Sequence, residues 1–174
     1  MDVSFADPQH GYVAVAEDNG DRYGAGIVMR TTDGGLNWEE HSVDGWLEEV
    51  FDLGGGYAWA VADTGSIFRT TDGAATWSDD GDIERRQYYS DLVFADELHG
   101  WVLSNKGRGI LASGDGGETW GRALRTKHHL IRIAVSPDGT AWAVGKTRSS
   151  PSRAVLMVGR EKKDGAATTS EQQR

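Results

Sequence analysis

The chain contains no cysteine, which excludes a disulfide framework, a cysteine-based zinc site and a thiol nucleophile. It also has no run that approaches the roughly 20 apolar residues needed to span a bilayer. Its start, Met1–Pro8, has neither a basic segment nor a long apolar run, unlike a secretory signal. We therefore expect a soluble chain with no signal peptide and no membrane span, and the sequence indicates no particular compartment.

Basic residues are scarce in the first half. Residues 1–87 contain 18 acidic and 5 basic residues, a net charge of −13, whereas residues 88–174 contain 9 and 13, a net charge of +4. The total of −9 disfavours nucleic acid as a partner, because phosphates attract basic proteins. The asymmetry can direct acidic and basic surfaces to different partners; a solvated surface without such a role is the alternative.

Glycine and tryptophan are abundant, with 24 and 7 residues, while there are 3 prolines. This composition favours short strands joined by tight turns. One stretch occurs three times, as Thr31–Trp38, Thr70–Trp77 and Ser113–Trp120, with the pattern Ser/Thr-x-Asp-x-Gly-x-Thr/Asn-Trp and with alanine for glycine in the second copy. A weaker fourth copy, Lys162–Thr169, has neither the first Ser/Thr nor the tryptophan. The copies are spaced 39, 43 and 49 residues apart, which suits one four-stranded unit each.

Apolar runs and turn residues predict the strands of these units. We expect them at 3–5, 12–16, 26–30 and 37–42, then 47–53, 57–62, 66–70 and 76–79, then 88–94, 100–104, 109–113 and 119–124, and finally 130–136, 140–145 and 154–159. The repeated stretch thus joins the third and fourth strands. The polar end, residues 161–174, is expected to be weakly paired or frayed.

A second pattern, Phe-x-Asp-x-x-x-Gly-aromatic, opens two of the units at Phe5–Tyr12 and Phe94–Trp101. With the first pattern it resembles the repeat of the photosystem II stability and assembly factor family, which are β-propellers built of BNR repeats with Asp-box turns. The chain is similar, more distantly, to sialidase-type and xyloglucanase-type propellers. The resemblance covers nearly the whole chain.

The resemblance implies an all-β fold, a β-propeller of about four four-stranded antiparallel blades in one domain of residues 1–174. The expected blades are 2–43, 46–80, 88–125 and 129–174, the last of them degenerate. Because members of the family usually close with six or seven blades, this chain is a fragment, a compact ring or half of a ring. We favour an incomplete array that self-association can close.

Each copy of the motif can satisfy its own polar groups. Its aspartate can accept hydrogen bonds from backbone N–H groups of the turn, glycine permits a positive φ, and tryptophan can pack beneath the turn. We therefore assign structural rather than catalytic or calcium-binding roles to Thr31, Asp33, Gly35, Trp38, Thr70, Asp72, Thr76, Trp77, Ser113, Asp115, Gly117 and Trp120.

Ligands of such propellers usually lie at the face opposite this turn, on the loops between second and third strands and between blades. The candidate partner-binding residues there are Arg22, Tyr23, Arg85, Arg86, Tyr88, Arg108, Lys127, His128, His129 and Arg148, together with Asp63 and Arg153. Basic residues recur among them, which suits a protein or peptide with acidic groups; a solvated rim is the alternative. Neighbouring histidines on a strand point to opposite faces, so we expect no metal and no other cofactor.

Two classes of function follow from this pattern. The first is a non-enzymatic scaffold for protein binding or assembly, which the family resemblance implies. The second is a glycan-binding or glycoside hydrolase propeller, similar to sialidases. A xyloglucanase-type hydrolase would need two carboxylates across a cleft, and Glu48, Glu49, Asp63 and Asp91 are the available ones. Nothing in the spacing selects a pair of them for acid–base catalysis, and we favour the scaffold.

Overall fold

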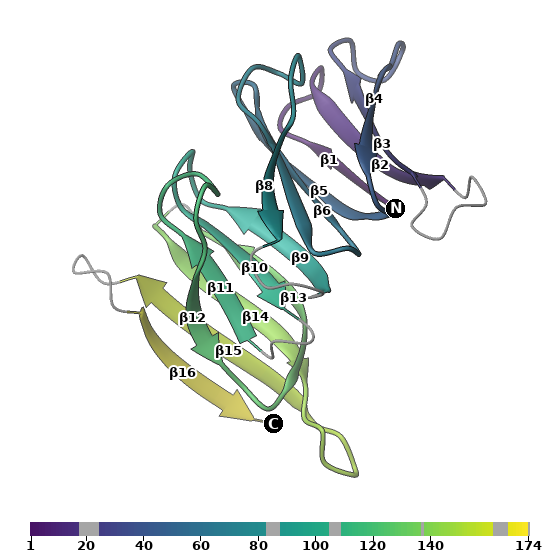
Figure 1. The fold of residues 1–174 in the computed structure, drawn as a ribbon. Helices are drawn as coiled ribbons and strands as arrows, with labels where there is room; N and C mark the ends of the chain where they lie inside the picture. The colour runs from purple at the N-terminus through teal and green to yellow at the C-terminus, as the bar shows by residue number, and fades with distance from the viewer. Residues whose placement is uncertain (18–24, 83–87, 105–108, 137, 162–166, 174) are drawn as a thin grey trace. The chain divides into compact units, whose positions relative to one another are not determined.

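The computed structural model describes residues 1–17, 25–82, 88–104, 109–136, 138–161 and 167–173. Within these ranges it contains strands and no helix. The strands form four antiparallel sheets of four strands each, and neighbours in every sheet follow one another in the chain (Figure 1). The predicted fold class, all-β with four-stranded antiparallel sheets, is confirmed.

The strands of each sheet have the following bounds. Sheet 1 contains β1 (Asp2–Phe5), β2 (Gly11–Glu17), β3 (Ala25–Thr31) and β4 (Glu39–Asp44). Sheet 2 contains β5 (Leu47–Gly54), β6 (Tyr57–Ala62), β7 (Ser66–Thr70) and β8 (Ser78–Asp82). Sheet 3 contains β9 (Tyr89–Phe94), β10 (Gly100–Ser104), β11 (Gly109–Ser113) and β12 (Gly121–Arg125). Sheet 4 contains β13 (His129–Val135), β14 (Thr140–Lys146), β15 (Ala154–Glu161) and β16 (Ala167–Gln173).

The fourth strand of sheets 1 to 3 begins two residues later than predicted, at Glu39, Ser78 and Gly121. The reason is local. The backbone N–H groups of Asn37, Thr76 and Thr119 donate to the aspartate of the preceding turn, so these residues belong to the turn and the strand starts after them.

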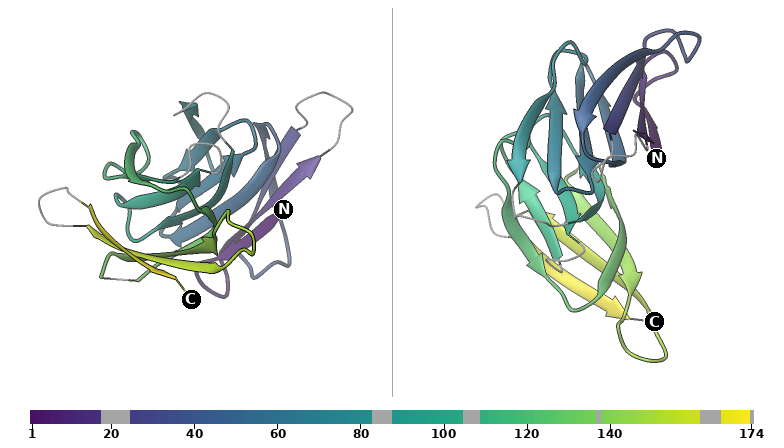
Figure 2. Two further views of the ribbon diagram at one scale, coloured as in Figure 1. Left: turned by 90° about the horizontal axis from the view of Figure 1, so that it is seen from below. Right: turned by 45° about the vertical axis from the view of Figure 1, so that its right-hand side comes forward.

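The chain divides into two compact units, residues 1–92 and residues 93–174. In unit 1, sheets 1 and 2 pack face to face around a core that includes Ala14, Val28, Val50, Ala60 and Phe68. The sheets have the twist usual for antiparallel strands, which is visible in both views of Figure 2.

The innermost strands of unit 1 are also joined by hydrogen bonds. Side chains of β1 accept from the backbone of β5: Val50 N–H donates to Asp2 (3.2 Å) and Asp52 N–H donates to Ser4 (3.0 Å). The side-chain carboxylate of Asp52 also accepts a hydrogen bond from the N–H of Ala6, at 3.2 Å. Burial raises the pKa of this carboxyl. The free edge of β5 therefore has partners in the neighbouring sheet.

Unit 2 contains the last two residues of β9, strands β10 to β12 of sheet 3, and the whole of sheet 4. Here β10 lies against β13. The buried side chains of the unit include Val102, Leu103, Ile133, Ala143 and Met157. Apolar residues from two sheets thus form its core, as in unit 1.

The expectation of a weakly paired end at residues 161–174 is wrong. β16 pairs with β15 along its whole length, from Glu161↔Ala167 to Val155↔Gln173. Ladder hydrogen bonds form between main chains, so a polar segment with β-branched residues such as Thr168 and Thr169 can still add a strand to a sheet. Residues Lys162–Ala166 of the fourth motif copy lie outside the described residues.

Candidate functional site

Each repeated turn is closed by its aspartate. In the second turn, Asp72 Oδ1 accepts from the Thr70 hydroxyl (2.9 Å) and the Thr76 N–H (3.0 Å), while Oδ2 accepts from the Thr76 hydroxyl (2.7 Å). The Thr70 oxygen in turn accepts from the N–H of Ala74 at 2.8 Å. The third turn contains the same set of bonds, and in the first turn the side-chain amide of Asn37 donates to Asp33 in place of the threonine hydroxyl. These carboxylates therefore have structural partners on both oxygens.

Each repeated turn is also tied to the turn between the first and second strands of its sheet. The N–H groups of Gly34, Gly73 and Gly116 donate to the carbonyls of Gln9, Gly56 and Leu98 at 2.9, 3.0 and 2.8 Å. In sheets 1 and 3 the partner turn is closed by a further aspartate. Asp7 accepts from the N–H of His10 at 2.9 Å, and Asp96 accepts from that of His99 at 2.8 Å. This end of the sheets, which we call the turn end, is fixed by hydrogen bonds.

The tryptophans complete the turns. Trp38 packs edge-on against Phe5 (centroids 6.3 Å apart), and its indole N–H donates to the Gly35 carbonyl at 3.1 Å. Trp120 makes the equivalent contacts with Phe94 (5.9 Å) and Gly117 (3.0 Å). Each of these tryptophans thus joins its turn to the first strand of the same sheet.

The second turn differs from the other two. Ala74 adopts a φ of 66°, in the left-handed region where the first and third turns have glycine, which carries a steric cost for alanine. Its tryptophan, Trp77, packs edge-on against Tyr12 of sheet 1, with centroids 6.1 Å apart. In unit 1 this turn therefore helps to join the two sheets.

The hydrogen bonds of the turns favour ionised carboxylates. Those from the side chain and backbone of Thr76 lower the pKa of Asp72 from 3.8 to about 2. Slight burial opposes this at Asp115, yet hydrogen bonds from Thr119 and Ser113 hold its pKa at about 2. A general acid needs a pKa near the working pH, so these groups suit a structural role.

The two low pKa values predict an acid-dependent loss of stability. A carboxyl whose pKa is lower in the folded than in the unfolded chain stabilises the fold above about pH 4, and this contribution is lost as the pH falls towards about 2. We expect Asp72→Asn with Asp115→Asn to be less stable than the wild type at pH 5 and to lose less on acidification. Denaturant unfolding at several pH values measures this. Asp44→Asn, at an exposed residue outside the turns, should keep the wild-type pH dependence, and an unchanged dependence in the double variant would contradict the prediction.

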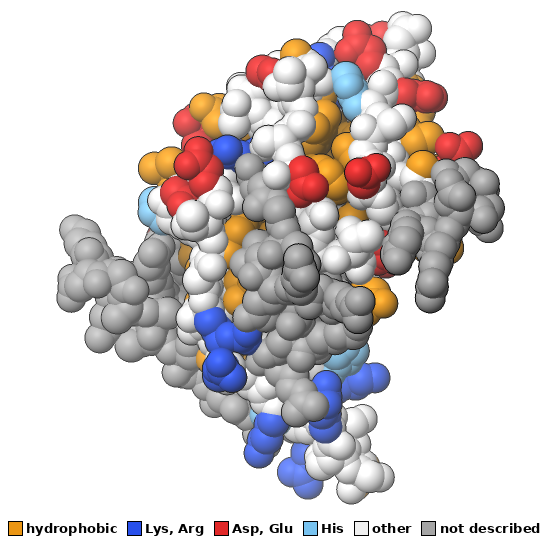
Figure 3. Space-filling view, in the orientation of Figure 1, with side chains coloured by type: hydrophobic (Ala, Val, Ile, Leu, Met, Phe, Trp, Pro, Cys, Tyr) orange, Lys and Arg blue, Asp and Glu red, His pale blue; other side chains and the backbone are white. Residues whose placement is uncertain are grey.

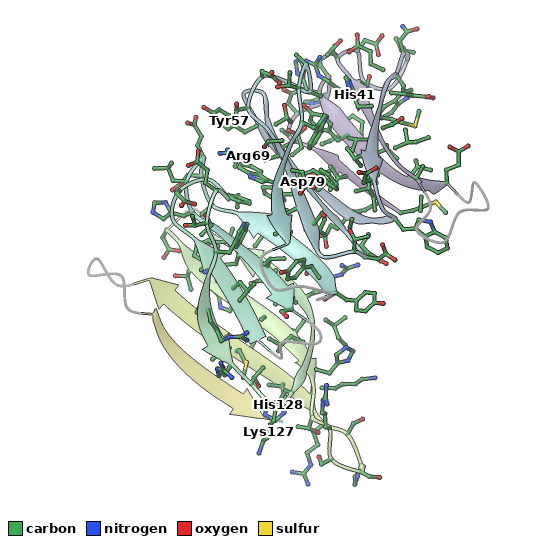
Figure 4. The ribbon with its side chains drawn as sticks, viewed as in Figure 1. His41, Tyr57, Arg69, Asp79, Lys127 and His128 are labelled. Atoms are coloured by element: carbon green, nitrogen blue, oxygen red, sulfur yellow. The ribbon has the colours of Figure 1, made fainter. Side chains whose placement is uncertain are left out.

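The opposite end of unit 2 is basic. Antiparallel order brings the β12–β13 connection and the β14–β15 loop to this end, and the register pairs His129 with Lys146. The exposed bases there are Arg125, Lys127, Lys146, Arg148 and Arg153, which we call the basic end. The acidic side chains described in unit 2 lie at its turn end, at Asp96, Glu97, Asp115, Glu118 and Asp138. Figure 3 shows Lys and Arg side chains gathered where Figure 4 labels Lys127.

Hydrogen bonds fix the longer loop of the basic end. The N–H of Thr147 donates to the Arg153 carbonyl (2.8 Å), and the N–H of Arg153 donates to the Thr147 hydroxyl (2.9 Å). That hydroxyl also lies 2.9 Å from the hydroxyl of Ser149. The two arginines of the loop therefore extend from a closed backbone, and less freedom is lost when they bind a ligand.

The predicted partner-binding residues have different positions. Lys127, His129 and Arg148 lie together at the basic end, whereas His128 is 4% exposed, so its side chain is not available to a partner. His128 directly precedes β13, where the chain enters the sheet, and its side chain is buried there. Tyr88 is exposed and precedes β9 in unit 1. Arg22, Tyr23, Arg85, Arg86 and Arg108 lie outside the described residues.

Sequence reasoning missed two bases of this end, Arg125 and Lys146. Each is the last residue of its strand, β12 or β14, and each directly follows the predicted end of that strand. Antiparallel topology alone, which sends second and fourth strands towards the same end, would have identified them.

The carboxylates considered for glycoside hydrolysis lie in different settings. Asp91 is buried, Glu48 is exposed, and Asp63 accepts from the N–H of Trp46 at 3.2 Å. In the part of the chain that the structure describes, no three His, Asp or Glu residues are grouped as metal ligands. The same part contains no helix that could span a membrane.

Solved structures with a similar fold are propellers. The chain is similar to "YCF48 bound to D1 peptide", with a TM-score of 0.63 and 17% identity over 99% of this chain and 68% of that one. For YCF48 from Cyanidioschyzon merolae the TM-score is 0.61 and the identity 15%, over 98% of this chain and 70% of that one. For PorZ, a bacterial surface component of the type-IX secretion system of Porphyromonas gingivalis, they are 0.65 and 13%, over 98% and 26%.

No family model and no curated protein matches the sequence. At identities this low the similarity concerns the fold. The four consecutive four-stranded sheets and the similar structures together identify the chain as a β-propeller type of protein with about four blades, as in a partial propeller.

Proposed function

We propose that this chain is a non-enzymatic scaffold that binds an acidic segment of a protein partner at the basic end of unit 2. The observation that carries the proposal is the separation of charge within the unit. Five exposed bases, Arg125, Lys127, Lys146, Arg148 and Arg153, share one end, and the acids whose side chains the structure describes lie at the other.

Electrostatics supports an anionic ligand at this end. Bases on neighbouring loops add their fields, so an acidic segment meets a positive potential there although the whole chain is acidic. Guanidinium groups can bind carboxylates through two parallel hydrogen bonds, and both arginines of the 147–153 loop are exposed. An extended peptide with several carboxylates can contact both connections at once.

The comparison with solved structures supports a peptide rather than a small anion. The similar fold of YCF48 was solved with a D1 peptide bound, so a fold of this type can hold a peptide in that protein.

Association between copies of this chain, which the number of blades leads us to expect, is a separate proposal. Glycan binding or hydrolysis is the competing proposal.

Binding of a fluorescent Glu-rich peptide, followed by anisotropy, tests the proposal. We expect Arg148→Gln with Arg153→Gln to weaken binding about tenfold, because two exposed charge pairs contribute about 0.5–1 kcal/mol each. Added salt should weaken wild-type binding as well.

A matched control separates the local effect from net charge. Leu36→Glu with Leu98→Glu, at exposed turn positions, changes the net charge by the same amount and should leave affinity nearly unchanged. Equal loss in both double variants would refute the basic end as the site. Hydrolysis of sialyl or β-glucan reporters that is abolished by one carboxylate substitution would favour the competing proposal.

A further inference from the structure

Sheet 1 has two apolar faces, and within the described ranges of the chain only one of them is buried. Tyr12, Ala14 and Val28 point to sheet 2 and are buried in the core of unit 1. The opposite face consists of the alternate residues of β1, β2 and β3, which are partly or fully exposed: Val3, Phe5, Val13, Val15, Ile27 and Met29. We call this set face 1. Val3, at its inner edge, is 59% exposed.

Sheet 4 repeats the arrangement in unit 2. Ala141, Ala143, Val155 and Met157 are buried. The register places the alternate residues on the other side of the sheet, again partly or fully exposed: Ala134, Trp142, Val144, Leu156 and Val158. We call this set face 4. Val144, in the middle of β14, is 46% exposed.

These faces differ from what a solvated sheet surface requires. A strand with one face in water alternates apolar and polar residues, whereas a strand covered on both sides is apolar throughout. β6 and β10 meet the second condition, because Ala58–Ala62 and Gly100–Ser104 are buried without interruption. β2 and β14 have the same continuous apolar character, but half of it is uncovered. Apolar area of this kind marks an interaction surface.

The two faces are also complementary in charge. Exposed acids share the surface of face 1: Met29 is paired with Glu40, and Glu17 and Asp44 flank Ala25. Exposed bases share that of face 4, where Val144 is paired with Arg132 and Lys146 follows two residues later. Among the described strand residues on these surfaces, face 1 has no base and face 4 has no acid.

We propose that copies of this chain associate head to tail, with face 1 of one copy packed on face 4 of the next. Sheet 1 already packs on sheet 2 in this manner, through its other apolar face. A second copy supplies both the apolar cover and the opposite charge that each face needs. The contact is heterologous, so it generates either a closed ring or a longer chain of copies.

Two substitutions with opposite charge test the pairing, with mass measured by sedimentation over a range of micromolar concentrations. Val144→Glu adds an acid to face 4, opposite the acids on face 1 of the neighbouring copy. Val3→Lys adds a base to face 1, opposite the bases on face 4 of the neighbouring copy. We expect the wild type to associate and each variant to bind its own copies at least about tenfold more weakly, because like charges repel across the contact and a charged side chain replaces a buried apolar one. Circular dichroism checks that both variants fold.

Mixing the two variants tests the direction of the contact. Each retains one intact face, so an equimolar mixture should associate although neither variant does so alone. Leu98→Glu and Leu36→Lys, the matched controls in exposed turns, should associate like the wild type. A wild type that stays monomeric, controls that dissociate like the variants, or a mixture that stays monomeric would each overturn the proposal.

Discussion

Replacing Trp59 with alanine is expected to lower the free energy of unfolding by about 3–5 kcal/mol. Trp59 lies in the middle of β6, is 0% exposed, and stacks on Tyr57 with ring centroids 6.4 Å apart. Its strand neighbours are Phe51 and Arg69. Alanine would leave a cavity in this sheet, because the surrounding strands hold their positions through ladder hydrogen bonds.

Denaturant unfolding followed by circular dichroism measures this loss. Trp46→Ala removes the same side chain from the connection between sheets 1 and 2, where it is 41% exposed, and is expected to cost about 1 kcal/mol or less. Similar losses in the two variants would show that burial of Trp59 does not determine its contribution.

The substitution Gly145→Ala is expected to destabilise unit 2 by about 3 kcal/mol, the upper part of the range for overpacking. A Cβ at Gly145 would lie 2.1 Å from the carbonyl oxygen of His129 and 2.7 Å from the Cα of Leu130. Both atoms are backbone of β13, beside the irregular register between Leu130 and Arg132. Side-chain rotation cannot relieve this overlap, so the β13–β14 ladder must open.

Gly121→Ala is the matched control for this prediction. Gly121 also lies in a strand, β12, but no atom lies within 4 Å of a Cβ placed there. Alanine is favoured over glycine in a strand interior by roughly 0.5–1 kcal/mol, so this variant should be as stable as the wild type or slightly more stable. Thermal unfolding of both variants provides the comparison. A wild-type melting temperature for Gly145→Ala would show that the approach of the strands is not as close as described.

The fold could be predicted because the signals were local and repeated. Three turns with aspartate, glycine and tryptophan at blade spacing fixed where third strands end, and β6, β7, β10 and β11 have the predicted bounds. The starts of β4, β8 and β12 could not be placed as well. Strand propensity does not reveal that Thr76 N–H and its equivalents are bound to a carboxylate. β16 was missed because main-chain pairing leaves little trace in a polar sequence.

The candidate site was less predictable than the fold. Lys127 and Arg148 were selected from their loops alone, but their proximity depends on the pairing of His129 with Lys146, which no local pattern encodes. The burial of His128 depends on the direction in which the chain enters β13. Arg125 and Lys146 could be added only when the strand ends were known. Surface charge at one end of a sheet is therefore a property of topology, and sequence suggests it only indirectly.

The hydrogen bonds between turns have a consequence for how such a chain can diversify. The connection from third to fourth strand is seven residues long in sheets 1, 2 and 3, whereas that from second to third strand has seven, three, four and seven residues in sheets 1 to 4. An insertion at the turn end would separate Gly34, Gly73 or Gly116 from its carbonyl partner, whereas the connections at the other end already differ in length from sheet to sheet. After duplication, copies of the unit can therefore keep one end constant in length and change the other, so new specificities can arise without loss of the fold.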